Sequence, residues 1–149
     1  MHPQLPTGAQ VRPAFTIFEL TITLCILSIL SAIAIPRVGR LLDSIHVHGA
    51  ATEIESLFSV ARHLAIARGV LSTVEIDPAK RVMSVSVGED TLRRLELGTT
   101  HEVQLAATRT RMSYGPTGMG YGAANLSVVV QRNASVDTVF VSRLGRVRH

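Results

Sequence analysis

One carboxylate, Glu19, lies within a stretch of sequence that contains no other charged side chain, residues 15–35. At about 1.5 Å of rise per residue, a helix over this stretch is about 30 Å long, which matches the hydrocarbon core of a bilayer. A charge in such a place costs on the order of a few kcal/mol unless something pairs with it. Glu19 is therefore a candidate functional charge. The alternative is a side chain that reaches the headgroups near the end of a membrane helix.

Positive charge is concentrated in the last part of the chain. The whole sequence has a formal net charge of +4, and residues 108–149 hold six arginines against one aspartate, a net of +5. Such a segment favours an acidic partner, and the alternative is a solvated loop and tail near a membrane. The arginines are Arg109, Arg111, Arg132, Arg143, Arg146 and Arg148.

Other residue patterns do not predict chemistry. His46 and His48 are two residues apart and face different sides of a helix, so that together with His63 they do not predict a metal site. The glycines of residues 118–122 lack the strand-to-helix context of a nucleotide-binding loop. No spacing suggests a Ser/His/Asp or Cys/His arrangement. We therefore expect no enzyme activity, no cofactor and no metal.

Composition narrows the function further. Aromatic residues make up 4% of the chain and tryptophan is absent, which disfavours an aromatic-lined ligand pocket. The single cysteine, Cys25, lies in the apolar stretch and cannot form an internal disulfide. Cysteine usage therefore does not reveal the redox compartment.

Two segments with helical periodicity precede the rest of the chain. Pro36 follows the apolar stretch, and we expect it to kink the helix because it lacks the backbone N–H and clashes with the preceding turn. Apolar residues then recur with i, i+3, i+4, i+7 spacing, which predicts a helical face that covers a sheet. Gly69 is expected to end this helix. The apolar residues are Ile54, Leu57, Phe58, Ala61, Leu64 and Ala65.

After Gly69 the period changes from 3.6 to two, which indicates strands. We predict a loop over residues 111–125, which hold four glycines and a proline, and a hairpin loop over 132–135. We predict an α+β fold, in which a long N-terminal helix that can span a membrane packs on a C-terminal antiparallel β-sheet head. The strands are expected over 72–77, 81–87, 92–97, 102–106, 126–131 and 136–142.

The N-terminal motif resembles that of type IV pilins and type II secretion pseudopilins. Residues 14–20 read AFTIFEL, and Glu19 and Pro36 follow Phe15 at the spacing typical of that superfamily. The resemblance implies that prepilin peptidase removes residues 1–14 by cutting after Ala14, where the family usually has glycine, and then methylates Phe15. It also implies that Glu19 pairs with the amine of another subunit in the filament. A cleaved secretory signal with a site near residues 31–34 is the less favoured alternative.

Parts of the expected head resemble the GspH/FimT family of minor pseudopilins and pilins. These parts are residues 61–69, residues 114–118 and the closing sequence Gly145-Arg146-Val147-Arg148. The resemblance implies a minor filament subunit in the inner membrane. Residues 15–40 would form its single membrane-spanning and assembly helix, and residues 41–149 its periplasmic head. Its implied partners are other pilin or pseudopilin subunits, prepilin peptidase and the membrane.

Two other functions stay open at this stage. The closing sequence matches the Gly-Arg-x-Arg tail of DNA-binding members of the family that act in natural transformation, and two arginines on a mobile tail can reach adjacent phosphates. The other alternative is a monotopic membrane protein with no role in a filament. The candidate DNA-binding residues are Arg143, Arg146, Arg148, Arg109 and Arg111.

Overall fold

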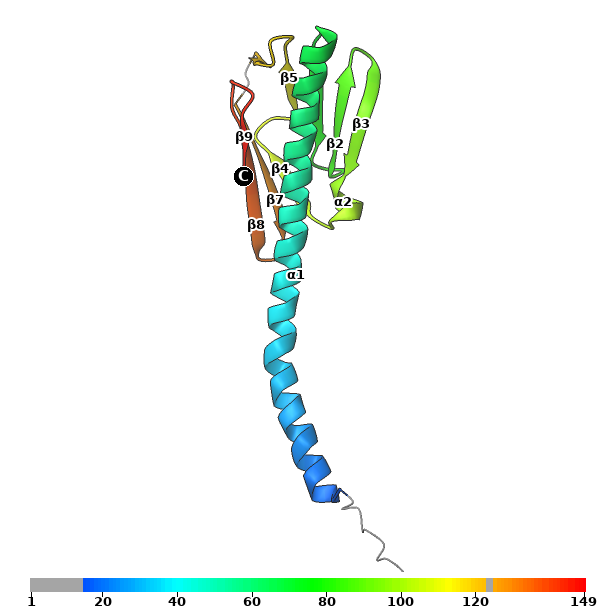
Figure 1. The fold of residues 1–149 in the computed structure, drawn as a ribbon, viewed down its shortest axis with the longest axis vertical. Helices are drawn as coiled ribbons and strands as arrows, with labels where there is room; N and C mark the ends of the chain where they lie inside the picture. Colours follow the sequence, from blue (N-terminus) through cyan, green and yellow to red (C-terminus); the bar gives the residue numbers. More distant parts are fainter. Residues whose placement is uncertain (1–14, 123–124) are drawn as a thin grey trace, which may run out of the picture. The chain divides into compact units, whose positions relative to one another are not determined.

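A single long helix, α1 (Ile17–Arg68), begins the described part of the chain. The computed structural model describes residues 15–122 and 125–149, and the chain divides into two compact units, residues 1–37 and 38–149 (Figure 1). Helix α1 runs through both units. The predicted processing residue Ala14 lies outside the described residues.

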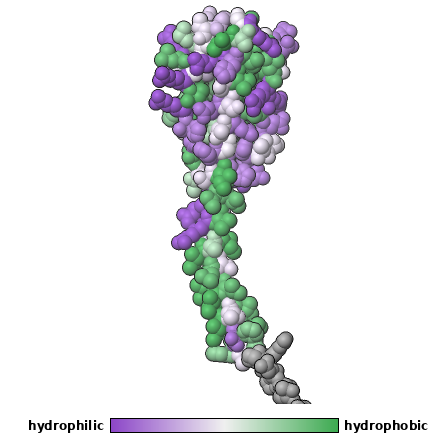
Figure 2. Space-filling view, viewed as in Figure 1, coloured by the Kyte–Doolittle hydropathy of each residue, from purple (hydrophilic) through white to green (hydrophobic). Residues whose placement is uncertain are grey.

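The first unit contains the apolar half of α1. This is the one helix among the described residues that is long and apolar enough to cross a membrane, and the rest of the described chain buries none of its most apolar window. Figure 2 shows an almost continuous hydrophobic surface along this part of the helix. Pro36 lies within α1, with helical residues on both sides, next to the boundary between the units. The kink at Pro36 stays a prediction.

The second unit holds the hydrophobic core, and the second half of α1 supplies one side of it. The predicted apolar face is confirmed: Ile54, Leu57 and Phe58 are fully buried, as are Ala61 and Ala65. Helix α1 ends at Arg68, and Gly69 adopts a φ of 64° that lets the chain leave the helix, as predicted. The core is completed by apolar residues from the two sheets that this half of α1 packs against.

The first sheet has five antiparallel strands in the order β3-β2-β1-β5-β6. Alternate residues of its central strands, such as Val74 and Ile76 of β1 and Met83 and Val85 of β2, face the core. The chain makes a tight turn between β1 and β2. The strands are β1 (Ser72–Asp77), β2 (Val82–Val87), β3 (Asp90–Glu96), β5 (Arg111–Tyr114) and β6 (Gly120–Tyr121).

The second sheet has four antiparallel strands in the order β4-β7-β8-β9. Strands β7 and β8 form the predicted hairpin, whose turn consists of Asn133 and Ala134. A one-turn helix, α2 (Leu97–Thr100), leads into this sheet and buries Leu97. The strands are β4 (Gln104–Ala107), β7 (Leu126–Arg132), β8 (Ser135–Val141) and β9 (Val147–Arg148).

The fold class is confirmed, but two local predictions were wrong. Residues 111–125 are not wholly a loop, because Arg111–Tyr114 forms β5 and pairs with β1, and Gly120–Tyr121 forms β6. The closing segment is not a mobile tail, because Val147–Arg148 pairs with β8 as strand β9. Strand β5 pairs with the distant β1, whereas β6 and β9 each pair with the strand directly before them, and in each case this pairing outweighs the turn propensity of the neighbouring residues.

Candidate functional site

The start of α1 holds a helix cap that includes Glu19. The Thr16 hydroxyl accepts a hydrogen bond from the Glu19 backbone N–H at 3.2 Å, and the Thr16 carbonyl accepts one from the Leu20 N–H at 3.1 Å. Thr16 is therefore the N-cap, and the spacing Thr16-x-x-Glu19 is that of a capping box. Sequence reasoning missed this motif, although its T-x-x-E spacing is visible in the sequence.

The position of Glu19 lowers the cost of its charge. Glu19 lies in the first turn of α1, where the unpaired backbone N–H groups carry a partial positive charge. This interaction is typically worth about 0.3–1 kcal/mol, less than the cost of a carboxylate in hydrocarbon. The helix end alone therefore does not offset the cost of the Glu19 charge, and a cation that pairs with Glu19 would lower this cost further.

Three hydroxyl groups of the apolar stretch are satisfied within their own helix. The hydroxyls of Thr21, Thr23 and Ser28 donate to carbonyls three or four residues earlier, at distances of 2.7–2.8 Å. Such bonds allow hydroxyls to lie in an apolar environment without an external partner. Glu19 thus differs from these residues, because a carboxylate can donate nothing to a carbonyl.

The second candidate site is built on strand β9. Arg148 lies opposite Phe140 of β8, and Val147 lies opposite Val141. Side chains alternate across a strand, so Arg148 shares the outer face of the sheet with Phe140, whereas Val147 packs against the core with the buried Val141. Arg146, two residues before Arg148, belongs to the same outer face.

The turn before β9 depends on Gly145. Its φ is 76°, and its N–H donates to the Ser142 carbonyl at 2.9 Å, while the Ser142 N–H donates to the Arg146 carbonyl at 2.9 Å. A Cβ atom at Gly145 would lie 2.6 Å from the Gly118 carbonyl oxygen. Gly145 therefore forms a tight, closely packed turn that holds Arg146 in place. This corrects the expectation that Arg146 and Arg148 lie on a mobile tail.

Three of the five candidate DNA-binding arginines meet at one groove. Arg109, Arg146 and Arg148 line it together with Phe140 and Leu144, both of which are well exposed. None of the described residues that line the groove is acidic. We name this surface the basic groove. It combines positive charge with an exposed aromatic ring, whereas the sequence suggested only charge.

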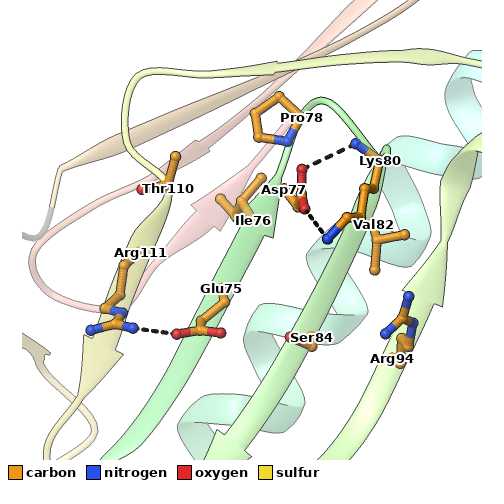
Figure 3. A pocket seen from close by; sticks show the side chains of 10 residues that line it. All are labelled: Glu75, Ile76, Asp77, Pro78, Lys80, Val82, Ser84, Arg94, Thr110 and Arg111. Atoms are coloured by element: carbon orange, nitrogen blue, oxygen red, sulfur yellow. Dashed lines mark hydrogen bonds and ion pairs between the residues drawn. The ribbon is translucent and has the colours of Figure 1, made fainter.

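The other two candidates lie elsewhere. Arg111 lies on β5 opposite Glu75 of β1, and its guanidinium forms an ion pair with the Glu75 carboxylate (Figure 3). The side chain of Arg143 is exposed, but it is not among the residues that line the basic groove. Its backbone N–H donates to Asn125 Oδ1, and its carbonyl accepts from the Gly120 N–H. Arg111 is thus neutralised by a neighbour, and Arg143 fixes the loop that precedes the turn.

The surface around Arg111 is a mixed-charge patch. Asp77 accepts a hydrogen bond from the Lys80 backbone N–H at 3.0 Å and lies 3.3 Å from the Lys80 ammonium (Figure 3). The hydrogen bond from the Lys80 N–H lowers the pKa of Asp77 below its usual value. These contacts close the β1–β2 turn, so this patch has a structural explanation.

Tyr114 is a polar group in the core. Its side chain is fully buried, and its hydroxyl has no hydrogen-bond partner among the described residues. Burial raises the pKa of Tyr114 to about 12, because the charged phenolate would lose its hydration, and the nearby Arg62 partly opposes this effect. Tyr114 lies opposite Ser72 of β1, where it anchors β5 to the sheet.

The three helical histidines separate, as their spacing predicted. His46 lies edge-on to His101, and His63 lines a different groove of the second unit. His48, however, lies close to Asp137 of β8 and to His149, which follows β9. Sequence reasoning considered only partners within the helix and therefore missed this cluster.

In the second unit the second half of α1 packs on two antiparallel sheets, and this architecture also occurs in solved structures of pilin-like proteins. No protein-family model matches the sequence, and no curated protein matches it. Two crystal structures of the type IV minor pilin FimU from Pseudomonas aeruginosa are similar, at TM-scores of 0.61 and 0.58 and identities of 14% and 15%. Each covers 68% of this chain, and the match covers 86% and 90% of the FimU chains.

A pseudopilin has the same fold. The minor pseudopilin EpsH of the Vibrio cholerae type 2 secretion system matches with a TM-score of 0.55 and 12% identity, over 69% of this chain and 94% of the EpsH chain. At such identities the similarity defines the fold and does not distinguish a pilus from a secretion system. The similarity confirms the α+β fold that the resemblance implies.

Proposed function

We propose that this protein is a structural minor subunit of a type IV pilus or a type II secretion pseudopilus. The supporting observation is the first half of α1, an apolar helix that the rest of the described chain leaves uncovered. A helix that exposes apolar side chains on all sides needs lipid or other helices around it. In the membrane lipid covers it, and in a filament the helices of other subunits do.

The proposed path of the protein has three steps. The chain inserts into the inner membrane through residues 15–35 with its head in the periplasm, and prepilin peptidase cuts after Ala14 and methylates Phe15. The charged amine of Phe15 in one subunit then pairs with Glu19 of another. Such a pair fixes the axial register, because a shift of one helix leaves a buried charge unpaired.

The capping box suggests a sharp test of the role of Glu19. Glu19→Gln removes the charge but keeps a side chain that can take part in a capping box, whereas Thr16→Ala removes the cap and keeps the charge. If Glu19 acts by pairing with an amine, Glu19→Gln inserts and is cleaved but enters filaments poorly. Thr16→Ala assembles, because loss of the cap costs only about 1 kcal/mol.

The measurement is the amount of each variant in filaments sheared from cells of the natural host, compared with the amount in the inner membrane. Mass spectrometry of the membrane fraction should show a mature chain that begins at N-methylated Phe15 in both variants. An intact Met1 or a cut after Ala34 contradicts the processing step. Normal assembly of Glu19→Gln, with loss of assembly in Thr16→Ala, would show that Glu19 serves only the helix cap.

DNA binding is a second candidate function, and the basic groove is the observation that favours it. Arg109, Arg146 and Arg148 can contact phosphates, and the exposed ring of Phe140 can stack on a base of single-stranded DNA. Contacts to phosphates and stacking on bases carry little information about base sequence. Binding is therefore expected to be weak, indifferent to sequence and sensitive to salt. Its test opens the Discussion.

A further inference from the structure

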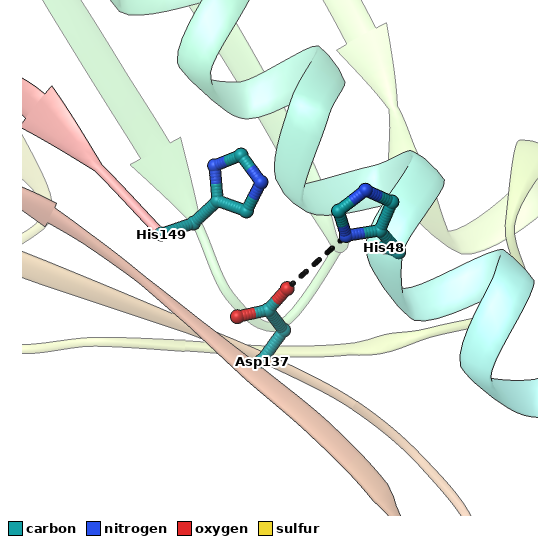
Figure 4. Close-up of side chains that lie close together, drawn as sticks. All are labelled: His48, Asp137 and His149. Atoms are coloured by element: carbon teal, nitrogen blue, oxygen red, sulfur yellow. Dashed lines mark ion pairs between the residues drawn. The ribbon is translucent and has the colours of Figure 1, made fainter.

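Three potential metal ligands from distant parts of the sequence meet beside α1. They are His48 of α1, Asp137 of β8 and His149, and Figure 4 shows their side chains directed toward one another. One ligand atom from each residue lies within 4.8 Å of the other two. His48 Nδ1 is 3.8 Å from Asp137 Oδ2. We name these three residues the His-Asp-His cluster.

The alternation of the second sheet explains why the cluster forms. Val139 and Val141 of β8 are buried against the core, so Asp137, two residues before Val139, belongs to the same helix-facing side. Beyond β9 the same alternation turns His149 inward, opposite to Arg148. Arg146 and Arg148 thus line the basic groove, and they also border a second groove beside α1, whereas His149 faces α1.

A fourth residue orients His149. The Glu55 carboxylate lies 3.0 Å from His149 Nδ1. Glu55 is seven residues, or two turns, after His48, so both side chains lie on one face of α1. A carboxylate at Nδ1 holds the proton on that nitrogen and leaves Nε2 as a free ligand. Histidines that bind metals usually donate their other N–H to a carboxylate or a carbonyl in this way.

We propose that His48, Asp137 and His149 bind a Zn²⁺ ion, with Glu55 as the residue that positions His149. Two imidazole nitrogens and one carboxylate oxygen suit zinc, which binds three protein ligands and a water in open tetrahedral sites. Bonds of about 2.0–2.1 Å in a tetrahedral site place ligand atoms about 3.3 Å apart. The ligand atoms, which now lie within 4.8 Å of one another, would reach this spacing by side-chain rotation, for which the exposed His48 has room.

Zinc at this site would join α1 to the end of β9. Strand β9 pairs with β8 at only two positions, so a further link to the helix would add most to the stability of these last residues. The ion would therefore stabilise the strand that carries Arg146 and Arg148. Calcium and magnesium do not suit the site, because they prefer oxygen ligands.

The test is a titration of the full chain, in a non-ionic detergent and without a polyhistidine tag, with ZnCl₂. Competition with a chromogenic chelator gives the affinity and stoichiometry, and we expect one Zn²⁺ per chain. His48→Ala, His149→Ala and Asp137→Ala should each weaken binding at least about tenfold. Glu55→Gln should weaken it by about 10- to 100-fold, because it removes the charge that orients His149.

His63→Ala is the matched control, since His63 lies on the same helix but outside the cluster. It should bind Zn²⁺ as the wild type does, and an excess of Ca²⁺ should not displace the ion. Circular dichroism identifies any variant that fails to fold, and Glu55→Gln then provides the test without loss of a ligand. The proposal is overturned if the wild type shows no saturable binding, or if His63→Ala loses as much affinity as His48→Ala.

Discussion

Replacing Arg146 and Arg148 with alanine removes two of the three arginines that line the basic groove. If each arginine of the groove contacts one phosphate, the wild type displaces the counterions of three phosphates, and the double variant those of one. The slope of log affinity against log salt concentration on duplex DNA is about −0.9 for each phosphate. The expected slopes are therefore about −2.7 for the wild type and about −0.9 for the variant.

These slopes translate into a large difference in affinity. Between 50 and 200 mM salt, the wild type should lose about 40-fold in affinity and the double variant only about 3- to 4-fold. The assay is fluorescence anisotropy with labelled DNA and the full chain in a non-ionic detergent. Duplexes of unrelated sequence should give equal affinities, because the arginines contact phosphates and not base edges.

The matched control is Arg94→Ala with Arg111→Ala. This pair removes the same charge from the first sheet, where Arg94 and Arg111 are paired with Glu96 and Glu75. The control should keep the wild-type salt slope. The reasoning is refuted if the control flattens the slope as much as the groove variant, or if the wild type shows no salt-sensitive binding at low ionic strength. Neither result bears on the proposed filament role.

Two further predictions concern the stability of the second unit. Gly145→Ala should destabilise the protein by more than Gly88→Ala. Both glycines have a positive φ, which costs alanine about 1–2 kcal/mol, but of the two only Gly145 would place its new Cβ against a backbone oxygen, 2.6 Å away. Equal losses of stability in urea unfolding would contradict this explanation. Tyr114 should make unfolding easier at high pH, because burial raises its pKa to about 12 in the folded state. Between about pH 10 and 12 the unfolded chain loses a proton that the folded chain keeps, so the free energy of unfolding falls as pH rises. In Tyr114→Phe the free energy of unfolding should not show this decrease at high pH, and it should be at least as large at pH 7, since the buried hydroxyl has no partner among the described residues. If the variant keeps the pH dependence of the wild type, Tyr114 does not cause that dependence.

Local patterns in the sequence predicted the elements of this fold well. The face of α1 that includes Ile54 and Phe58 follows from helical spacing, and the central strands follow from alternation. The end of α1 follows from Gly69, because glycine has no Cβ and adopts a positive φ at little steric cost. The weakest predictions were short strands such as β5 and β6, whose glycine-rich and proline-rich neighbourhood resembles a loop until a partner strand is present.

Residues that act within one helix could also be identified from the sequence. The apolar stretch and the single charge of Glu19 are visible in the order of residues alone. The length of an apolar stretch and a charge within it indicate a membrane helix with a functional charge without any knowledge of tertiary contacts. The capping box at Thr16 was equally accessible, since its two residues are three positions apart.

Only the tertiary structure decided which distant residues lie together. Arg109 and Arg111 are equivalent in the sequence, but the start of β5 places Arg111 beside Glu75, whereas Arg109 lies at the groove with Arg146. His48 and His149 are about a hundred residues apart and meet because β9 pairs with β8 in one register. A shift of that register by one residue would exchange the faces of the strand, and would turn the arginines inward and the histidine outward. Contacts between residues so far apart depend on the packing of the whole core, which no local pattern of residues contains.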